Sequence, residues 1–247
     1  AHGSPEAGVN LAPVAGSLRD LFTTYLPPFR AAITEAGALA VMPAYSEFLD
    51  TPAPQNALLL SRILREAWGF AGYVYSDYAA IQMLHTFHRT AATPAEAGRL
   101  ALQAGLDLEA PADYGFGPHL IDMVHDGTLP VALIDLAVTR ILRVKFLAGL
   151  FENPYADERK LSVINCLEHR ALALLAARES AVLLKNDGPL LPLAPELTSL
   201  AVIGPNAAAA QVGDYTRPTD RAVSPLAGLQ ALLPDVALRY AKGCELY

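Results

Sequence analysis

The sequence contains 247 residues, of which 53% are apolar, and it carries a formal net charge of −7. A chain of this length forms one large domain or two smaller ones, and its apolar content is sufficient for a sizeable core. The net negative charge and the absence of a Lys/Arg cluster argue against a nucleic-acid partner. Charged or proline residues interrupt every apolar run before it reaches the ~20 residues that span a bilayer, so we expect no transmembrane helix.

Cysteine and histidine usage indicates neither a disulfide framework nor a metal centre. Cys166 and Cys244 are the only cysteines and lie far apart, so we expect two free thiols. The histidines show no ligand spacing with carboxylates, and we expect no metal and no cofactor. Because the chain begins at Ala1 without a leader pattern, we expect it to start inside a longer protein, and the sequence leaves its compartment open.

Apolar periodicity predicts alternating helices and strands over the first 150 residues. In chain order, we expect a helix within 18–35, a strand at 39–44, a helix at 56–66, a strand at 73–75, a helix at 93–104, a strand at 106–108 and a helix at 133–147. Thr93 and Pro94 are typical of a helix N-cap and of the first helical position. The repeated order of strand, loop and helix indicates a parallel sheet or barrel of the α/β class.

The composition changes after Gly149. Residues 151–165 begin with a charged, proline-containing run that lacks periodicity, and we interpret them as a linker. Beyond them we expect a helix at 166–177 and buried strands at 180–185 and 199–204. The sequence therefore predicts a domain at 1–150, the linker, and a second α/β domain at 166–247.

Asp77 is the most informative residue, because its carboxylate comes directly after a predicted apolar strand. Tyr73, Val74 and Tyr75 form an uncharged, β-prone run, and Asp77 comes where this strand leaves the core. In parallel α/β folds the reacting groups lie at the C-terminal ends of strands, which makes Asp77 a candidate for catalysis. An aspartate here can also cap the helix that follows, and the local sequence leaves both roles open.

Six segments carry a resemblance to a known family: residues 37–47, 68–78, 104–111, 179–193, 201–207 and 240–244. In their order and separations they resemble glycoside hydrolase family 3, the family of β-glucosidases and β-xylosidases. The resemblance implies a partial (β/α)8 TIM-type barrel, of which this chain holds the last three strands, with the first five strands upstream of Ala1. It implies that the beginning of an α/β sandwich domain follows.

The resemblance also implies a retaining β-glycosidase that acts on terminal β-linked glucose or xylose, with Asp77 as the nucleophile. Retention needs a second carboxyl group, ~5 to 5.5 Å from the first, that protonates the leaving oxygen. In the family this acid/base lies in the sandwich domain, so we expect it beyond Tyr247. Within the chain, Glu47, Asp107 and Glu109 lie near predicted strand ends, and Glu47 is the fallback for this role.

Met42, Tyr45 and Tyr78 are the candidate sugar-binding residues around Asp77, because sugars need flat apolar faces and hydrogen bonds to their hydroxyl groups. The resemblance places Met42 and Tyr45 at the end of the strand before the nucleophile, and Tyr78 where many members have Trp. Packing in the core is the alternative role of these side chains. The expected partners are a β-linked oligosaccharide or glycoside, and the rest of the same polypeptide or another subunit.

Two other classes of function follow from the residues. If the 247 residues are a whole gene product, the missing acid/base favours a non-catalytic carbohydrate-binding or regulatory remnant of such an enzyme. A nucleotide-binding sheet that opens at 202–206 is disfavoured, because no GxGxxG pattern is present.

Overall fold

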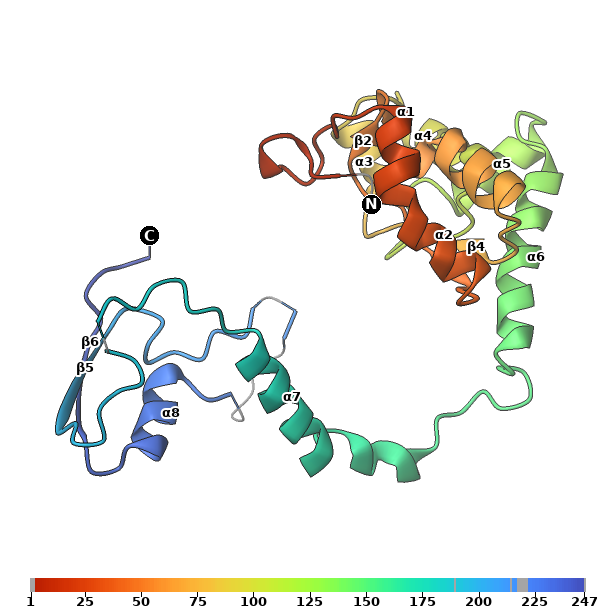
Figure 1. Cartoon of the computed structure of the whole chain (residues 1–247). Coiled ribbons are helices and arrows are strands. Elements are labelled where there is room, and N and C mark those ends of the chain that lie inside the picture. The colour runs from red at the N-terminus through yellow and green to blue at the C-terminus, as the bar shows by residue number, and fades with distance from the viewer. Residues whose placement is uncertain (1–2, 189, 214, 217–221, 247) are drawn as a thin grey trace. The chain divides into compact units, whose positions relative to one another are not determined.

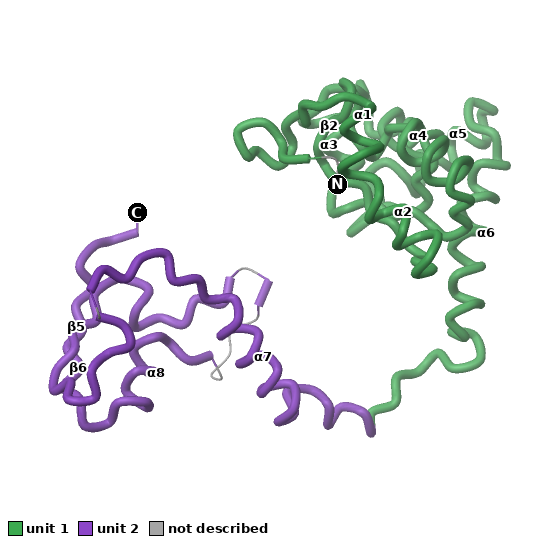
Figure 2. Tube along the Cα trace, viewed as in Figure 1, with its two compact units in different colours: residues 1–158 green, residues 159–247 purple. Residues whose placement is uncertain are grey.

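A computed structural model describes residues 3–188, 190–213, 215–216 and 222–246. The chain separates into two compact units, Ala1–Glu158 and Arg159–Tyr247, which are shown in different colours in Figure 2. The 3-10 helix η5 (Glu158–Val163) lies at the change from unit 1 to unit 2. Each unit has its own helices and strands, many of which are labelled in Figure 1.

Unit 1 alternates helices with very short strands. In chain order it contains η1 (Glu6–Gly8), α1 (Leu18–Asp20), η2 (Leu21–Tyr25), α2 (Leu26–Thr34), β1 (Ala40–Val41), β2 (Glu47–Phe48), β3 (Thr51–Pro52), η3 (Ala53–Gln55), η4 (Leu58–Ala67), β4 (Tyr73–Val74), α3 (Ala80–Thr86), α4 (Pro94–Ala104), α5 (Pro118–His125) and α6 (Val131–Leu147). The four helices predicted from the sequence are confirmed, although η2 and η4 have π-helical hydrogen bonding.

Side-chain caps explain where two of these helices begin. Ser17 and Asp20 form a capping box at α1, in which each side chain accepts a hydrogen bond from the other residue's main-chain N–H. At α4, the Thr93 hydroxyl accepts the N–H of Glu96 at 3.1 Å, and Pro94 occupies the first helical position. The N-cap predicted for Thr93 is therefore confirmed.

Three predicted strands run in parallel in unit 1. β1 pairs with β4, with Val41 opposite Val74. Tyr75 continues the array through a parallel bridge to Leu108, so the predicted strand at 106–108 is reduced to a single bridge. Gly72 allows the close approach before β4, because a Cβ there would lie 2.1 Å from a main-chain carbonyl oxygen next to β1. The residues after these strands therefore emerge at one edge.

An antiparallel hairpin of β2 and β3 is a feature that the sequence did not reveal. Phe48 lies opposite Thr51, which leaves a two-residue turn at Leu49 and Asp50. Both turn residues have positive φ, 50° and 57°, as a tight turn that matches the strand twist requires. Leu-Asp is an unusual pair for this turn, in which Asn-Gly and Asp-Gly predominate, so the hairpin could not be predicted from its turn residues.

The main core of unit 1 lies where β4 packs against η4, α3 and α4. Its fully or nearly fully buried members include Leu60, Leu64, Phe70, Val74, Ile81, Leu84, Ala97, Ala101 and Leu106. Trp68 is half-buried and packs against this cluster and against a second one formed by Leu21, Phe48 and Ile63. The core therefore surrounds the strand that leads to Asp77.

In its described residues, unit 2 contains one parallel strand pair with a crossover helix. Its elements after η5 are α7 (Leu167–Glu179), β5 (Ser199–Ile203), α8 (Pro225–Leu232) and β6 (Ala237–Ala241). β5 and β6 pair in parallel over five residues each, from Ser199 opposite Ala237 to Ile203 opposite Ala241. The helix predicted at 166–177 and the strand predicted at 199–204 are confirmed, and both cysteines are free thiols, as expected.

Two expectations for unit 2 were wrong. Residues 181–187 form no strand, and the side chains of Val182, Leu183 and Leu184 are exposed instead of buried. β5 is likewise only half-covered, with exposed and partly buried residues in alternation. The physical reason is that a β-prone run becomes a strand only when a neighbouring strand binds its main-chain groups. Among the described residues, β5 has one such neighbour, β6, and the run at 181–187 has none.

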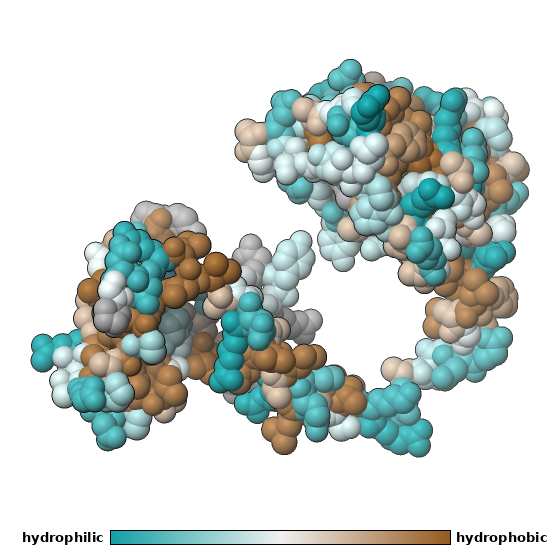
Figure 3. Space-filling model, in the orientation of Figure 1, coloured by the Kyte–Doolittle hydropathy of each residue, from teal (hydrophilic) through white to brown (hydrophobic). Residues whose placement is uncertain are grey.

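Apolar side chains also lie on the surface of α7. Leu167, Leu172, Leu174 and Leu175 are all more than half exposed, and Figure 3 shows brown apolar surface on this helix. No described helix of the chain combines the length and the apolar character that crossing a membrane requires.

Candidate functional site

Asp77 lies two residues beyond the bridge that ends the β4 ladder, and its side chain is partly exposed. Its Oδ1 accepts a hydrogen bond of 2.7 Å from the main-chain N–H of Tyr78. In the described part of the chain this is the carboxylate's only hydrogen bond, so Oδ2 has no protein donor. One carboxylate oxygen is therefore held by the backbone, while the other is available to a ligand.

The helix-capping role considered for Asp77 does not describe the structure. The N-cap residue of α3 is Ala79, which has left-handed φ and ψ of 60° and 14°, and no side chain caps this helix. The main-chain carbonyl of Asp77 accepts the N–H of Ala80 at 3.1 Å, so the backbone closes the turn. The Asp77 carboxylate has no part in starting the helix.

The residues on both sides of Asp77 are fixed to the loop that follows Leu108. The N–H of Ser76 donates to the carbonyl of Leu108 at 2.8 Å, and the Ser76 hydroxyl accepts the N–H of Ala110 at 2.8 Å. The carbonyl of Ala110 in turn accepts the N–H of Ala79 at 3.0 Å. We call residues 76–79 the Asp77 loop. Its position depends on the neighbouring strand's end as well as on β4.

Tyr45 and Tyr78 are brought together at this loop. The Tyr45 hydroxyl donates a hydrogen bond of 2.8 Å to the main-chain carbonyl of Tyr78, across 33 residues of sequence. Tyr45 is partly buried, whereas the Tyr78 side chain is 65% exposed and therefore free to contact a ligand. Two of the three candidate sugar-binding residues thus lie beside Asp77.

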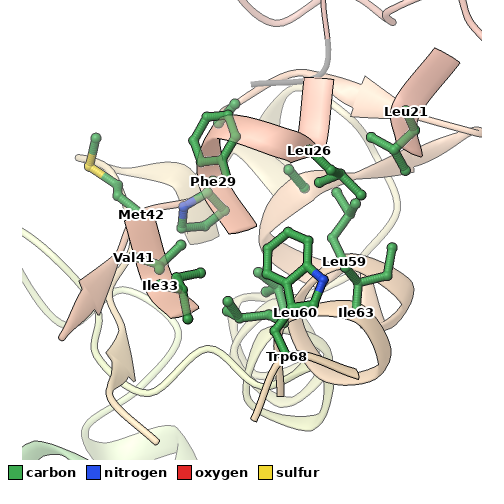
Figure 4. Close-up of a pocket in the computed structure, with 14 residues that line it drawn as sticks. Leu21, Leu26, Phe29, Ile33, Val41, Met42, Leu59, Leu60, Ile63 and Trp68 are labelled. Carbon is green, nitrogen blue, oxygen red and sulfur yellow. The ribbon is translucent and has the colours of Figure 1, made fainter. Parts of the chain in front are cut away.

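Met42 lies in a different environment. Its side chain is 48% exposed and lines an apolar pocket between α2, β1 and η4. Figure 4 shows Phe29, Ile33 and Val41 on one side of this pocket and Leu59, Ile63 and Trp68 on the other. No carboxylate lines the pocket, and neither Asp77 nor the two tyrosines do. Because a sugar site needs convergent polar groups, we do not identify this pocket as the functional site.

Asp107 is part of a buried ion-pair cluster. Its side chain is only 1% exposed, and its two oxygens accept hydrogen bonds from Arg65 at 2.5 Å and from Arg140 at 2.8 Å. The N–H of Val74 donates to the same carboxylate at 2.8 Å. Arg65 lies on η4 and Arg140 on α6, so the Asp107 carboxylate faces these helices. It is unavailable as an acid/base.

Glu109 closes the loop that follows its strand. Its Oε2 accepts the main-chain N–H groups of Gly115 at 3.0 Å and of Phe116 at 2.8 Å, and its Oε1 lies 3.1 Å from the same Gly115 nitrogen. Burial raises the pKa of Glu109 above its usual value, although these N–H groups and that of Tyr114 oppose the shift. Both oxygens already bind the protein, so the described contacts give Glu109 a structural role.

Glu47, the in-chain fallback for the acid/base, binds a histidine. Its Oε1 lies 2.7 Å from Nδ1 of His88, whose side chain is 1% exposed. Glu47 lies on β2, and His88 follows α3, so this pair connects the hairpin to the helix that begins after the Asp77 loop. Of the four candidate carboxylates, Asp77 and Glu47 therefore each have one hydrogen bond to a described residue, and the partner of Asp77 is a main-chain N–H group, whereas that of Glu47 is a histidine side chain.

The described residues contain no cluster of three or more His, Cys, Asp or Glu side chains that could hold a metal ion. Ser76 and Ala110, which fix the Asp77 loop, were not singled out from the sequence. These two residues bind each other across 34 residues of sequence, and no local pattern reveals such a contact.

Comparisons with known proteins agree with this picture of two parts. Residues 1–144 match the family model described as "Glycosyl hydrolase family 3 N terminal domain", and residues 181–243 match the "Glycosyl hydrolase family 3 C-terminal domain". The sequence is 37% identical to a periplasmic beta-glucosidase of Salmonella typhimurium, over 100% of this chain and 33% of that protein. It is 36% identical to a beta-xylosidase of Formosa agariphila, over 93% of this chain and 34% of that protein.

A solved structure of a beta-glucosidase also resembles this chain over its whole length. A beta-glucosidase from Listeria innocua, crystallised in complex with glucose, superimposes with a TM-score of 0.85 at 35% identity. The alignment covers 100% of this chain and 34% of that protein. The chain therefore spans about a third of the length of the relatives it matches.

Proposed function

This chain belongs to glycosyl hydrolase family 3, and on that premise we propose that the protein is a retaining β-glycosidase that removes terminal β-linked glucosyl or xylosyl residues. The observation that carries the proposal is the Asp77 carboxylate at the end of a parallel strand: one oxygen is bound to the backbone, and no described residue donates a hydrogen bond to the other. The names of the matched relatives, a beta-glucosidase and a beta-xylosidase, support the same reaction class.

We propose that unit 1 contributes the last three strands of a (β/α)8 barrel: β1, β4 and the segment around Leu108. Their parallel order supports this assignment, because the next strands of such a barrel would continue it from the open edge of β1. Residues 1–150 would then be the C-terminal portion of the barrel, 151–165 the linker, and 166–247 the beginning of an α/β sandwich domain. The first five strands would precede Ala1.

Asp77 is the nucleophile in this proposal. Its Oδ2 attacks the anomeric carbon, the bond from that carbon to the leaving oxygen breaks, and an acid protonates the leaving group. Water then cleaves the glycosyl-aspartate ester and restores the carboxylate, so the sugar keeps its configuration after two displacements. The hydrogen bond from Tyr78 N–H to Oδ1 fixes the direction in which Oδ2 points. The reaction requires no cofactor and no metal.

The acid/base and the sugar contacts complete the assignment. The family resemblance puts the acid/base in the sandwich domain, and we propose that it lies beyond Tyr247. Within the chain, Asp107 and Glu109 bind protein groups with both oxygens and Glu47 is bound to His88. The exposed ring of Tyr78 offers a stacking face, and Tyr45 supports the backbone beneath it. Met42, one residue after β1, is the third proposed contact on the ground of the family resemblance alone, since its side chain lines the apolar pocket and not the Asp77 loop.

The test is covalent trapping in the full-length protein. Incubation with a 2-deoxy-2-fluoro β-glucoside, and in parallel with the matching xyloside, is expected to add one sugar to the peptide that contains Asp77. Peptide mass spectrometry locates the label, and the faster of the two reagents identifies the preferred sugar. Asp77→Ala should remove the label, whereas Asp122→Ala, which deletes an exposed carboxylate on α5, should leave it unchanged.

Two results would contradict the proposal. A label on another residue in an active protein would remove Asp77 as nucleophile. Calorimetric binding of glucose or cellobiose without any turnover of a nitrophenyl glycoside would favour the carbohydrate-binding alternative.

A further inference from the structure

Ser76 has a buried hydroxyl group that joins two loops. The residue is 0% exposed and immediately precedes Asp77. Its Oγ accepts the N–H of Ala110 at 2.8 Å, and Ala110 belongs to the loop after the neighbouring strand. The bond belongs neither to a helix nor to a strand ladder, so the secondary structure alone does not require it.

We propose that Ser76 is a positioning residue for nucleophilic attack: its hydroxyl group binds the Asp77 loop to Ala110 and so fixes where the carboxylate points. This inference depends on the proposed function of Asp77 and goes beyond it, because Ser76 does not contact the reacting atoms. It acts through the backbone on both sides of Asp77.

Hydrogen bonds to the neighbouring strand end flank the Asp77 carboxylate on both sides. Both main-chain polar groups of Ala110 are used: its N–H binds Ser76 before Asp77, and its carbonyl binds the N–H of Ala79 after it. With Leu108 also binding the Ser76 N–H, the strand end at 108–110 holds the loop at three points. Asp77 therefore cannot shift along the strand direction without breaking one of these bonds.

Attack on an anomeric carbon is sensitive to such shifts. The reacting atoms must approach to about 3 to 3.5 Å with aligned orbitals, and a displacement of about 1 Å can cost about 100-fold in rate. The single backbone bond to Oδ1 sets the carboxylate's rotation but not the position of the loop. Among the bonds that join the loop to Leu108 and Ala110, only those of Ser76 Oγ can be deleted by changing a side chain: it accepts the Ala110 N–H at 2.8 Å and donates to the Ala110 carbonyl at 3.4 Å.

The chain provides a matched control for this deletion. Ser61 on η4 is a partly buried serine whose hydroxyl also makes a 2.8 Å hydrogen bond to a distant main-chain group, the carbonyl of Ala104. Ala104 precedes the strand segment at 106–108, whereas Ala110 follows it. Ser61→Ala therefore removes the same atom and a side-chain-to-main-chain bond of the same length from unit 1, although the Ser61 hydroxyl donates where that of Ser76 accepts, and it does so at the end of the strand opposite to Asp77.

The experiment compares Ser76→Ala and Ser61→Ala in the full-length protein. Thermal unfolding is measured for both, together with the first-order rate constant and the half-saturation concentration for trapping by the 2-fluoro glycoside. We expect the two variants to have similar unfolding midpoints. The trapping rate constant should be at least ~10-fold lower for Ser76→Ala alone, while the half-saturation concentration of this variant stays within ~2-fold of the wild type. The reason is that binding is retained while the alignment of the carboxylate is lost.

Each other outcome overturns the inference in a recognisable way. Wild-type trapping by Ser76→Ala, or equal slowing by Ser61→Ala, would reject the positioning role while the label on Asp77 kept the proposed function. Absence of the label from Asp77 in the wild type would reject the proposed function itself. If Ser76→Ala does not fold, Ser76→Cys retains the volume with a weaker acceptor, and wild-type trapping by that variant would reject the role.

Discussion

The hydroxyl group of Tyr45 donates a 2.8 Å hydrogen bond to the main-chain carbonyl of Tyr78, and so connects the residues after β1 to the Asp77 loop. Tyr45 follows β1, the neighbour of β4 on one side, whereas Ala110 follows the segment at Leu108, which bridges to Tyr75 on the other side. The Asp77 loop is therefore bound by residues from both neighbouring strand ends, and Tyr45 and Ser76 provide the side chains.

Replacing Tyr45 by Phe deletes this bond and keeps the ring. Because the change frees the Tyr78 carbonyl without emptying the space, we expect a loss of stability of about 1 kcal/mol and a fall in kcat/KM of roughly 3- to 10-fold. Thermal unfolding and nitrophenyl glycoside kinetics on the full-length protein measure the two effects. Unchanged kcat/KM would show that the bond has no influence on the loop.

Ala79 adopts a left-handed conformation that an L-amino acid finds unfavourable. Its φ of 60° costs about 1–2 kcal/mol through the Cβ, and glycine avoids this while losing about 0.5–1 kcal/mol in backbone entropy. We therefore expect Ala79→Gly to raise the free energy of unfolding by about 0.5–1 kcal/mol. Ala80→Gly, one residue later inside α3, should lower it by a similar amount, because the backbone there is right-handed. Denaturant unfolding of both variants distinguishes the two signs.

The Asp107 cluster should be the most sensitive electrostatic site of unit 1. Burial lowers the pKa of Arg65, the Asp107 carboxylate opposes that shift, and removal of the carboxylate leaves two guanidinium groups without their partner. We expect Asp107→Ala to destabilise unit 1 by about 3–5 kcal/mol. Asp187→Ala breaks an ion pair with Lys185 in which both side chains are more than 70% exposed, and should cost less than about 1 kcal/mol.

Thermal unfolding of the two variants tests this difference. Equal losses would contradict the buried cluster, whereas a loss confined to Asp107→Ala would support it. Restoration of the charge by Asp107→Glu should recover only part of the stability, because the extra methylene group displaces the carboxylate from the Val74 N–H that it now binds.

Local signals explain what the sequence could reveal. Thr93 followed by Pro94 gave a cap and a helix start, and the uncharged run before Asp77 gave a strand, because both patterns depend on residues within one turn or one strand. The family resemblance rested on short motifs and was confirmed by the domain matches. These features needed no knowledge of distant contacts.

Long-range contacts explain what the sequence could not reveal. Asp107 looked like a candidate at a strand end until its partners, Arg65 and Arg140, proved to lie 42 and 33 residues away. Ser76 gave no signal for the same reason. The run at 180–185 had the composition of a buried strand, but strand formation requires a neighbouring strand, which the described residues do not supply.

Glu109 should make stability depend on pH in a direction opposite to that of most carboxylates. Its pKa is raised by burial, so the folded protein holds this proton more tightly than the unfolded chain does. The resulting stabilisation is complete below the ordinary glutamate pKa and is lost as the pH rises through the folded value, because stability falls with pH wherever the folded state binds more protons. Glu109→Gln removes the titration while its amide oxygen can still accept the N–H groups of Gly115 and Phe116.

We therefore expect the unfolding midpoint of the wild type to fall relative to that of Glu109→Gln as the pH rises from about 4 to about 7. Glu66→Gln, which neutralises an exposed glutamate on η4, is the control for the general effect of one negative charge. Parallel curves for the wild type and Glu109→Gln would show that the N–H groups of residues 114–116 compensate fully for burial. A midpoint difference that widens toward neutral pH, and is absent for Glu66→Gln, would establish desolvation as the dominant effect on this loop.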